Sequence, residues 1–173
     1  MKPQQYSLVL ISALCIACGA PLEKKEEPAC HIKFRPVPEL MEAAQLAADR
    51  LREASGCEAE FVDKKGAQIL YSESVVDEDG KEACGITYAR ASTGRVSLID
   101  ISSNEETGCE GRLDDTIAHE LIHAFIGKPT EHAESGVFAL HNNANMVFNE
   151  SSLTVLCTYA LCSTFNVEAD RLP

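Results

Sequence analysis

The sequence is poor in basic residues. It has 15 Lys and Arg against 27 Asp and Glu, and its formal net charge is -12 at pH 7. A surface with this balance repels the phosphates of nucleic acid, so we expect no nucleic-acid partner. The acidic residues form no long block, and they are therefore typical of a solvated surface that keeps a protein soluble.

Long apolar runs are also missing. The apolar stretch at residues 7–17 is too short to cross a bilayer, because a membrane-spanning helix needs about 20 apolar residues. Lys2 precedes this stretch, and small residues surround Cys18 at its end. A weakly positive start, a short apolar run and a site of small residues together predict an export signal.

The end of this signal carries a short motif, because residues 16–19 read Ile-Ala-Cys-Gly. The motif resembles the lipobox of bacterial lipoproteins, in which a signal peptidase cuts before the cysteine. The resemblance implies a lipoprotein signal peptide at residues 1–17 and lipid on Cys18. Gly19, in place of aspartate, implies anchoring in the cell envelope at the outer membrane. Cys15 stands where the family usually has leucine, and a plain cleaved signal is the alternative.

CxxC spacing is absent from the six cysteines that follow Cys18. These are Cys30, Cys57, Cys84, Cys109, Cys157 and Cys162. CxxC pairs are typical of zinc sites with thiolate ligands, so such a site is not favoured. An even number of cysteines in an exported chain predicts three disulfides instead, although spacing does not choose among the pairings.

The 173 residues are enough for one domain with its own core. Residues 18–36 are rich in proline and charge and lack an apolar period, so we expect a tether there. The folded domain is then expected to span residues 37–173. No internal repeat interrupts it.

Hydrophobic periodicity predicts the elements of this domain. A helix is expected over residues 38–55, a second from a cap at Asp114 or Asp115 to Gly127, and a last one over residues 151–162. Four short strands are expected, at residues 59–62, 67–74, 85–89 and 95–102. Because strands and helices are grouped rather than regularly alternating, the fold class is expected to be α+β.

The second helix carries an HExxH motif at residues 119–123. His119 and His123 are four residues apart and share one helix face, with Glu120 nearby. Two neutral imidazoles are good Zn²⁺ ligands, but a catalytic zinc takes three protein ligands and leaves a position for water. His132, after the turn that ends the helix, is the predicted third ligand. The alternatives are His141, Glu134 and Glu150.

Residues 119–127 followed by His132 resemble a lengthened metzincin zinc motif, closest to bacterial matrixin-like peptidases. In the family the glycine and the third histidine follow the second histidine by three and six residues, whereas here they follow His123 by four and nine. The resemblance implies a zincin fold: a mixed twisted sheet, an N-terminal helix, an HExxH helix and a C-terminal helix. It also implies a residue beneath the metal, at Phe138 or Met146.

The function that the resemblance implies is that of a monomeric zinc-dependent metalloendopeptidase acting on a protein or peptide substrate. Zn²⁺ would lower the pKa of its bound water, and Glu120 would act as general base. The family's edge strand pairs with substrate, and residues 95–102 are expected to correspond to it. Two alternatives remain: a non-catalytic envelope-binding module that keeps this fold, and a zinc hydrolase of a non-peptide amide.

Overall fold

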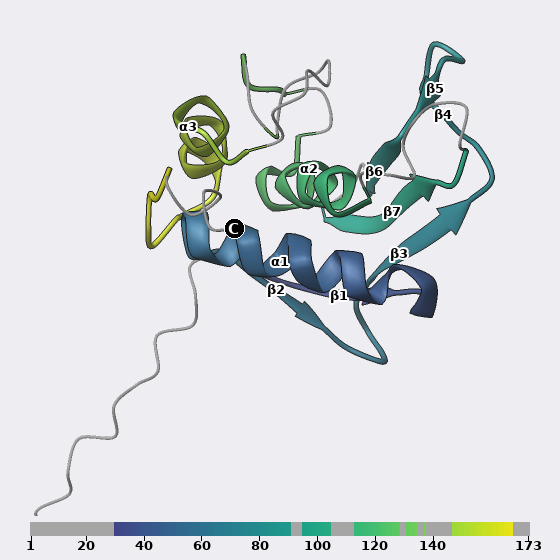
Figure 1. The fold of residues 1–173 in the computed structure, drawn as a ribbon, viewed down its shortest axis with the longest axis horizontal. Coiled ribbons are helices and arrows are strands. Elements are labelled where there is room, and N and C mark those ends of the chain that lie inside the picture. The colour runs from purple at the N-terminus through teal and green to yellow at the C-terminus, as the bar shows by residue number, and fades with distance from the viewer. Residues whose placement is uncertain are drawn as a thin grey trace, which may run out of the picture.

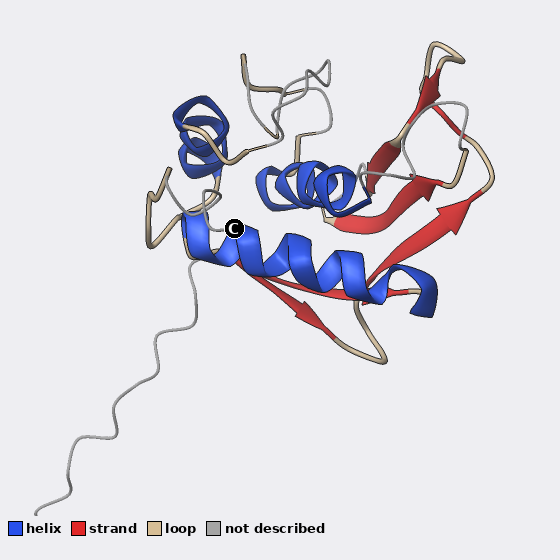
Figure 2. Cartoon of the chain, in the orientation of Figure 1, coloured by secondary structure: helices blue, strands red, loops and turns tan. Residues whose placement is uncertain are grey.

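The computed structural model describes residues 30–90, 95–104, 113–128, 131–134, 137 and 147–167. Within these residues the chain forms a mixed sheet, a two-stranded hairpin and three α-helices (Figures 1 and 2). The elements are, in chain order, β1 (His31–Pro36), a 3₁₀ turn (Pro38–Leu40), α1 (Met41–Ser55), β2 (Glu58–Phe61), β3 (Ala67–Ser72), β4 (Val75–Val76), β5 (Glu82–Ala83), β6 (Gly85–Ala89), β7 (Val96–Ser102), α2 (Leu113–Ile126) and α3 (Glu150–Tyr159). The α+β class and the mixed sheet expected from the sequence are confirmed.

The main sheet has five strands in the order β2-β1-β3-β7-β6. Neighbours among β2, β1, β3 and β7 run parallel, and β6 runs antiparallel to β7. The short β4 and β5 pair with each other just before β6. Among the described strands β6 therefore forms one edge of the sheet, and it is the only strand of that sheet with reversed direction.

The core lies between one face of the sheet and the helices α1 and α2 (Figure 1). Phe34, Ile69 and Ile99 come from adjacent strands, and each is fully buried. The Phe34 ring packs edge-on against Phe125 of α2, with 6.4 Å between the ring centroids. The apolar alternation of the strands thus matches the buried stripe of each helix, which is the pattern that drives this packing.

The first helix behaves as its sequence predicts. Its buried residues recur at helical spacing: Ala44, Ala47, Ala48, Leu51, Ala54 and Ser55. Gly56 then adopts a left-handed conformation with φ 71°, and its N–H donates to the oxygen of Arg52. Glycine takes this conformation without steric cost, so it ends the helix where the sequence places it.

The start of α2 differs from the expectation. Asp114 and Asp115 do not cap the helix, because the helix already includes Leu113 and both aspartates lie in its first turn. There they accept hydrogen bonds of 2.8 Å from the Nη1 atom of Arg50 on α1. Acidic side chains also interact favourably with the positive end of the helix dipole. The two aspartates therefore hold α2 to α1.

The tether predicted for residues 18–36 is wrong at its end. Residues 31–36 form β1, which lies inside the sheet between β2 and β3. Its charged residues hide its apolar alternation, since only Phe34 and Pro36 are buried. Cys18 and the predicted signal peptide lie outside the described residues. No helix in the described part of the chain is long and apolar enough to span a membrane.

The strand predicted at residues 95–102 is confirmed as β7, but its expected position at the edge is wrong. β7 lies between β3 and β6, and both of its neighbours use its main-chain hydrogen bonds. Residues 95–102 therefore cannot receive a substrate strand. The edge of the sheet nearest to α2 is formed by β6. The sequence does not predict this, because the order of strands in a sheet depends on tertiary packing and not on the spacing of strands along the chain.

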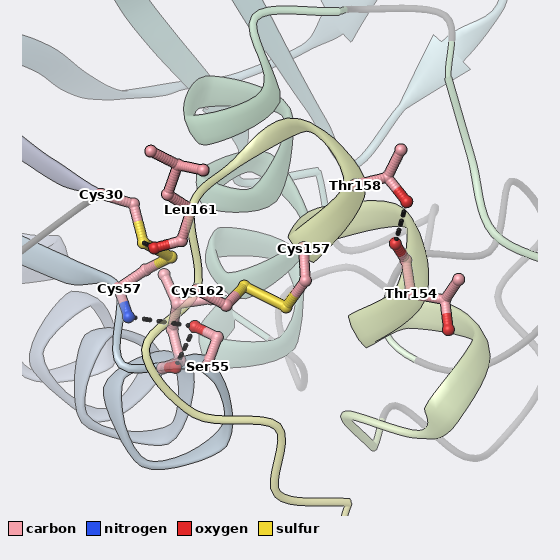
Figure 3. The surroundings of a disulfide bond; sticks show 9 residues. Cys30, Ser55, Cys57, Thr154, Cys157, Thr158, Leu161 and Cys162 are labelled. Carbon is pink, nitrogen blue, oxygen red and sulfur yellow. Dashed lines mark hydrogen bonds between the residues drawn. A yellow bond between two sulfur atoms is a disulfide. The ribbon is translucent and has the colours of Figure 1, made fainter.

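All cysteines within the described residues are disulfide-bonded: Cys30, Cys57, Cys84, Cys157 and Cys162. The described pairs are Cys30–Cys57 and Cys157–Cys162. Figure 3 shows the two pairs close together, with Sγ of Cys30 3.7 Å from the oxygen of Leu161. Cys30–Cys57 thus joins the start of β1 to the end of α1, and Cys157–Cys162 joins α3 to the segment that follows it. None of these cysteines can supply a thiolate to a metal.

The packing of α1 predicts a large difference between two identical substitutions. Leu51 is fully buried and Leu46 is 52% exposed on the same helix. Leu51→Ala should lower the free energy of unfolding by about 2–5 kcal/mol, because it leaves a cavity. Leu46→Ala should change it by about 0.5 kcal/mol or less. Denaturant unfolding of both variants measures the difference, and equal effects would contradict the described position of α1.

Candidate metal centre

The helix α2 presents the first two histidines of the site. His119 and His123 lie one turn apart, and the helix ends at Gly127, whose φ of 65° is left-handed. The N–H of Gly127 donates to the oxygen of His123, which closes the last turn. After this reversal the chain returns with His132 beside the helix.

The three imidazoles converge through their Nε2 atoms. Nε2 of His123 lies 3.1 Å from Nε2 of His119 and 3.2 Å from Nε2 of His132. The ligand atoms of all three residues lie within 4.8 Å of one another. For comparison, ligands at the usual Zn–N distance in a tetrahedron are about 3.3 Å apart. The spacing of the nitrogens is thus close to that of ligands around one small cation.

Main-chain oxygens orient two of the rings. Nδ1 of His119 lies 2.9 Å from the oxygen of Val137, and Nδ1 of His123 lies 2.9 Å from the oxygen of Lys128. A carbonyl oxygen can only accept a hydrogen bond, so Nδ1 carries the hydrogen in both rings. In a neutral imidazole this leaves a lone pair on Nε2. Outer hydrogen bonds of this kind fix the tautomer of histidines that bind metals.

The two rings are held in the neutral form by burial. Desolvation lowers the pKa of His119 and of His123 to about 4 in each case, although the hydrogen bonds to Val137 and Lys128 oppose the change. At neutral pH both Nε2 atoms therefore carry lone pairs that face each other at 3.1 Å. Two lone pairs at this distance repel unless a cation lies between them, so the donor set fits a bound metal ion.

Glu120 lies on the inner side of the helix, against β6. It is only 4% exposed, and its Oε2 accepts a hydrogen bond of 2.7 Å from Oγ1 of Thr87. Burial raises the pKa of this carboxyl, while a positive charge on His123, present only when that ring is protonated, and hydrogen bonds from Thr87 act in the opposite direction. A carboxyl with a raised pKa holds a proton more readily than an exposed glutamate does.

Lys128, whose main-chain oxygen orients His123, also makes a cation–π contact through its side chain. Nζ of Lys128 lies 4.2 Å from the centroid of the Tyr159 ring, at the end of α3. The same residue thus contacts α3 through its side chain and His123 through its oxygen. This links the segment after α2 to the third helix.

The structure brings together the predicted residues His119, Glu120, His123 and His132. The alternatives Glu134 and Glu150 are not part of the ligand group found among the described residues. His141, Phe138 and Met146 lie outside the described residues. No sequence signal points to Thr87, Val137 or Lys128, because each acts through a contact that exists only once sheet and helices have packed.

No protein-family model matches the chain, and no curated protein matches its sequence. The chemistry of the centre must therefore be inferred from its own geometry.

His132 is the residue whose substitution tests the centre most simply. His132→Ala should weaken Zn²⁺ binding by at least about a hundredfold, since loss of an outer hydrogen-bond partner alone costs about 10–100-fold. His31→Ala is the matched control, because His31 pairs with Glu60 on β1 and β2. Competition with a coloured chelator measures both affinities. Equal Zn²⁺ affinities in the two variants would show that His132 is not a ligand.

Proposed function

We propose that this protein is a zinc-dependent metalloendopeptidase. One observation carries the proposal: the Nε2 atoms of three histidines converge. Two of these histidines lie on α2, and the buried carboxyl of Glu120 lies on the same helix. A structural zinc site is closed by four ligands and needs no general base, whereas a catalytic site has three protein ligands and an open position. Three histidines with Glu120 beside them are the set that a catalytic site requires.

Zinc is the proposed ion because imidazole nitrogen is a preferred donor for it, although other transition metals also accept such donors. His119, His123 and His132 would hold it. When bound there, Zn²⁺ supplies Lewis-acid chemistry: it makes water more acidic and polarises a carbonyl group.

The role of this chain in proton transfer falls to Glu120. As a carboxylate it takes a proton from the attacking water, and as a carboxylic acid it returns the proton to the leaving amine. Its raised pKa, caused mainly by burial, suits both steps because the acid form is more accessible than in an exposed glutamate. The proton taken in the first step is the one given in the second, so Glu120 ends unchanged.

The class that we propose is metzincin-like. Support comes from the mixed sheet, the N-terminal helix α1, the HExxH helix α2 and the final helix α3, which follow the order that the resemblance implies. The longer interval before His132 is compatible with this class. Its Nε2 atom still lies 3.2 Å from that of His123 despite the nine intervening steps along the chain.

The proposed substrate is a protein or peptide that binds as an extended strand along the outer edge of β6. The oxygen of Cys84 accepts a hydrogen bond from the N–H of Ser102. Because main-chain groups alternate in an antiparallel pair, those of Gly85 and Thr87 face away from β7. The main-chain amide of Thr87 also contributes to the environment of the Glu120 carboxyl. This edge and the general base are therefore adjacent, so a strand added there would run past the site.

We further propose that the enzyme is a monomer anchored through lipid on Cys18 in the bacterial envelope. The support is the motif at residues 16–19 and the oxidised state of the described cysteines. Disulfides are typical of proteins that have left the reducing cytosol.

Glu120→Gln provides the decisive test of catalysis. The amide keeps the shape of the side chain but cannot take a proton, so cleavage of an unfolded protein should fall by at least about a hundredfold. Zinc content should stay near that of the wild type, because Glu120 is not among the proposed ligands. Glu53→Gln, on the exposed side of α1, is the matched control. Metal analysis and a fluorogenic cleavage assay of the full-length protein give the two readings.

A wild-type protein that binds zinc but cleaves no unfolded protein would contradict the peptidase and favour a binding module or a hydrolase of another amide. Full activity in Glu120→Gln would contradict the role of Glu120.

A further inference from the structure

Two residues of β6, Thr87 and Gly85, contact or leave space for the Glu120 side chain. Thr87 is 7% exposed, and its Oγ1 lies 2.7 Å from Oε2 of Glu120 and 2.9 Å from the main-chain oxygen of the same residue. Gly85, two residues earlier, lies on the same face of the strand. The general base of α2 is thus held by a strand that is more than thirty residues away in the sequence.

Gly85 supplies the space that the carboxyl occupies. A Cβ atom at this position would lie 2.9 Å from Cγ and 3.1 Å from Oε1 of Glu120. Real Cβ atoms essentially never show the first of these distances, and the second is unusually tight, so the Glu120 side chain would have to move. On its other side the same Cβ would meet Cδ1 of Ile101 at 3.1 Å, which is fully buried. Little room is therefore left for the strand to yield instead.

The Thr87 hydroxyl can serve Glu120 in both of its protonation states. When Glu120 is a carboxylate, the hydroxyl donates its single hydrogen to Oε2. When a proton sits on Oε2, that O–H donates to Oγ1, and the hydroxyl hydrogen can turn to the main-chain oxygen 2.9 Å away. When the proton sits on Oε1 instead, the first arrangement persists. In the carboxylate form and with the proton on Oε2, both Oγ1 and Oε2 therefore keep a hydrogen-bond partner.

We propose, on the basis of the peptidase function above, that Thr87 is a positioning residue for the reaction, with Gly85 providing the space. The Thr87 hydroxyl fixes the Glu120 carboxyl at one place on β6, through its contact of 2.7 Å with Oε2. A glutamate side chain has several rotatable bonds, so without this contact the carboxyl samples other rotamers. General-base catalysis depends on such placement, because the base must lie within hydrogen-bonding distance of the proton.

Thr87→Val removes the hydroxyl and keeps the shape of the side chain. Its kcat should fall about tenfold to a hundredfold, which is the effect expected for a lost hydrogen bond to a charged group. KM should stay within about twofold and zinc content should not change, because neither the substrate edge nor a proposed ligand is altered. Thr87→Ser keeps the hydroxyl and should restore most of kcat. Thr158→Val is the matched control, since its hydroxyl bonds only within α3, to the oxygen of Thr154.

The assay uses the full-length protein, a quenched fluorescent peptide that the wild type cleaves, and a thermal unfolding curve for each variant. A wild-type kcat in Thr87→Val would overturn the proposal, as would an equal loss in Thr87→Val and Thr87→Ser. If Thr87→Val fails to fold, the comparison passes to Thr87→Ser and Gly85→Ala. The serine variant should then keep kcat while the alanine variant loses it at unchanged zinc content. A kcat that is lost in Thr87→Ser but kept in Gly85→Ala would overturn the proposal.

The wild type separates this proposal from the proposed function. No cleavage by the zinc-loaded wild type would reject the peptidase itself. Cleavage by the wild type together with an unaffected Thr87→Val would reject only the role of Thr87.

Discussion

The site depends on the convergence of three imidazole nitrogens on one point. The Nε2 atoms of His119, His123 and His132 meet at distances that favour a shared cation, and the lone pairs of His119 and His123 repel each other without one. Two carbonyl oxygens, from Val137 and Lys128, determine which nitrogen of the neighbouring rings carries the lone pair. The electrostatics of the centre therefore follow from main-chain positions, and these are set by the fold.

The fold holds these positions through the burial of α2. Nine of its residues are buried, including Leu121 and Ile122, and the helix packs against β6 and β7, α1 and α3. Arg50 fixes its start by binding Asp114 and Asp115, and Gly127 ends it so that His132 can return. A helix that is buried over most of its surface has little freedom to shift, because each movement would expose apolar side chains to water. Rigid support of this kind keeps metal ligands in place.

The local parts of this arrangement could be predicted from the sequence and the parts that depend on sheet order could not. His119, Glu120 and His123 follow from helical spacing alone, and α1 follows from its apolar period and Gly56. The sequence predicts a tether at β1 because the charges of this strand mask the alternation of Phe34 and Pro36. It does not predict that β6 rather than β7 forms the edge, because strand order is decided by packing. The roles of Thr87 and Gly85 could not be predicted from the sequence either. Both depend on the approach of β6 to Glu120 of α2, and this strand and this helix meet only in the folded chain.

The most direct test of the centre is X-ray absorption at the zinc edge of the full-length protein loaded with one equivalent of Zn²⁺. Three imidazole nitrogens at about 2.0–2.1 Å, with one further light atom, are the predicted first shell. A shell with sulfur at about 2.3 Å, or with fewer than three imidazoles, would contradict the assignment of His119, His123 and His132 as ligands.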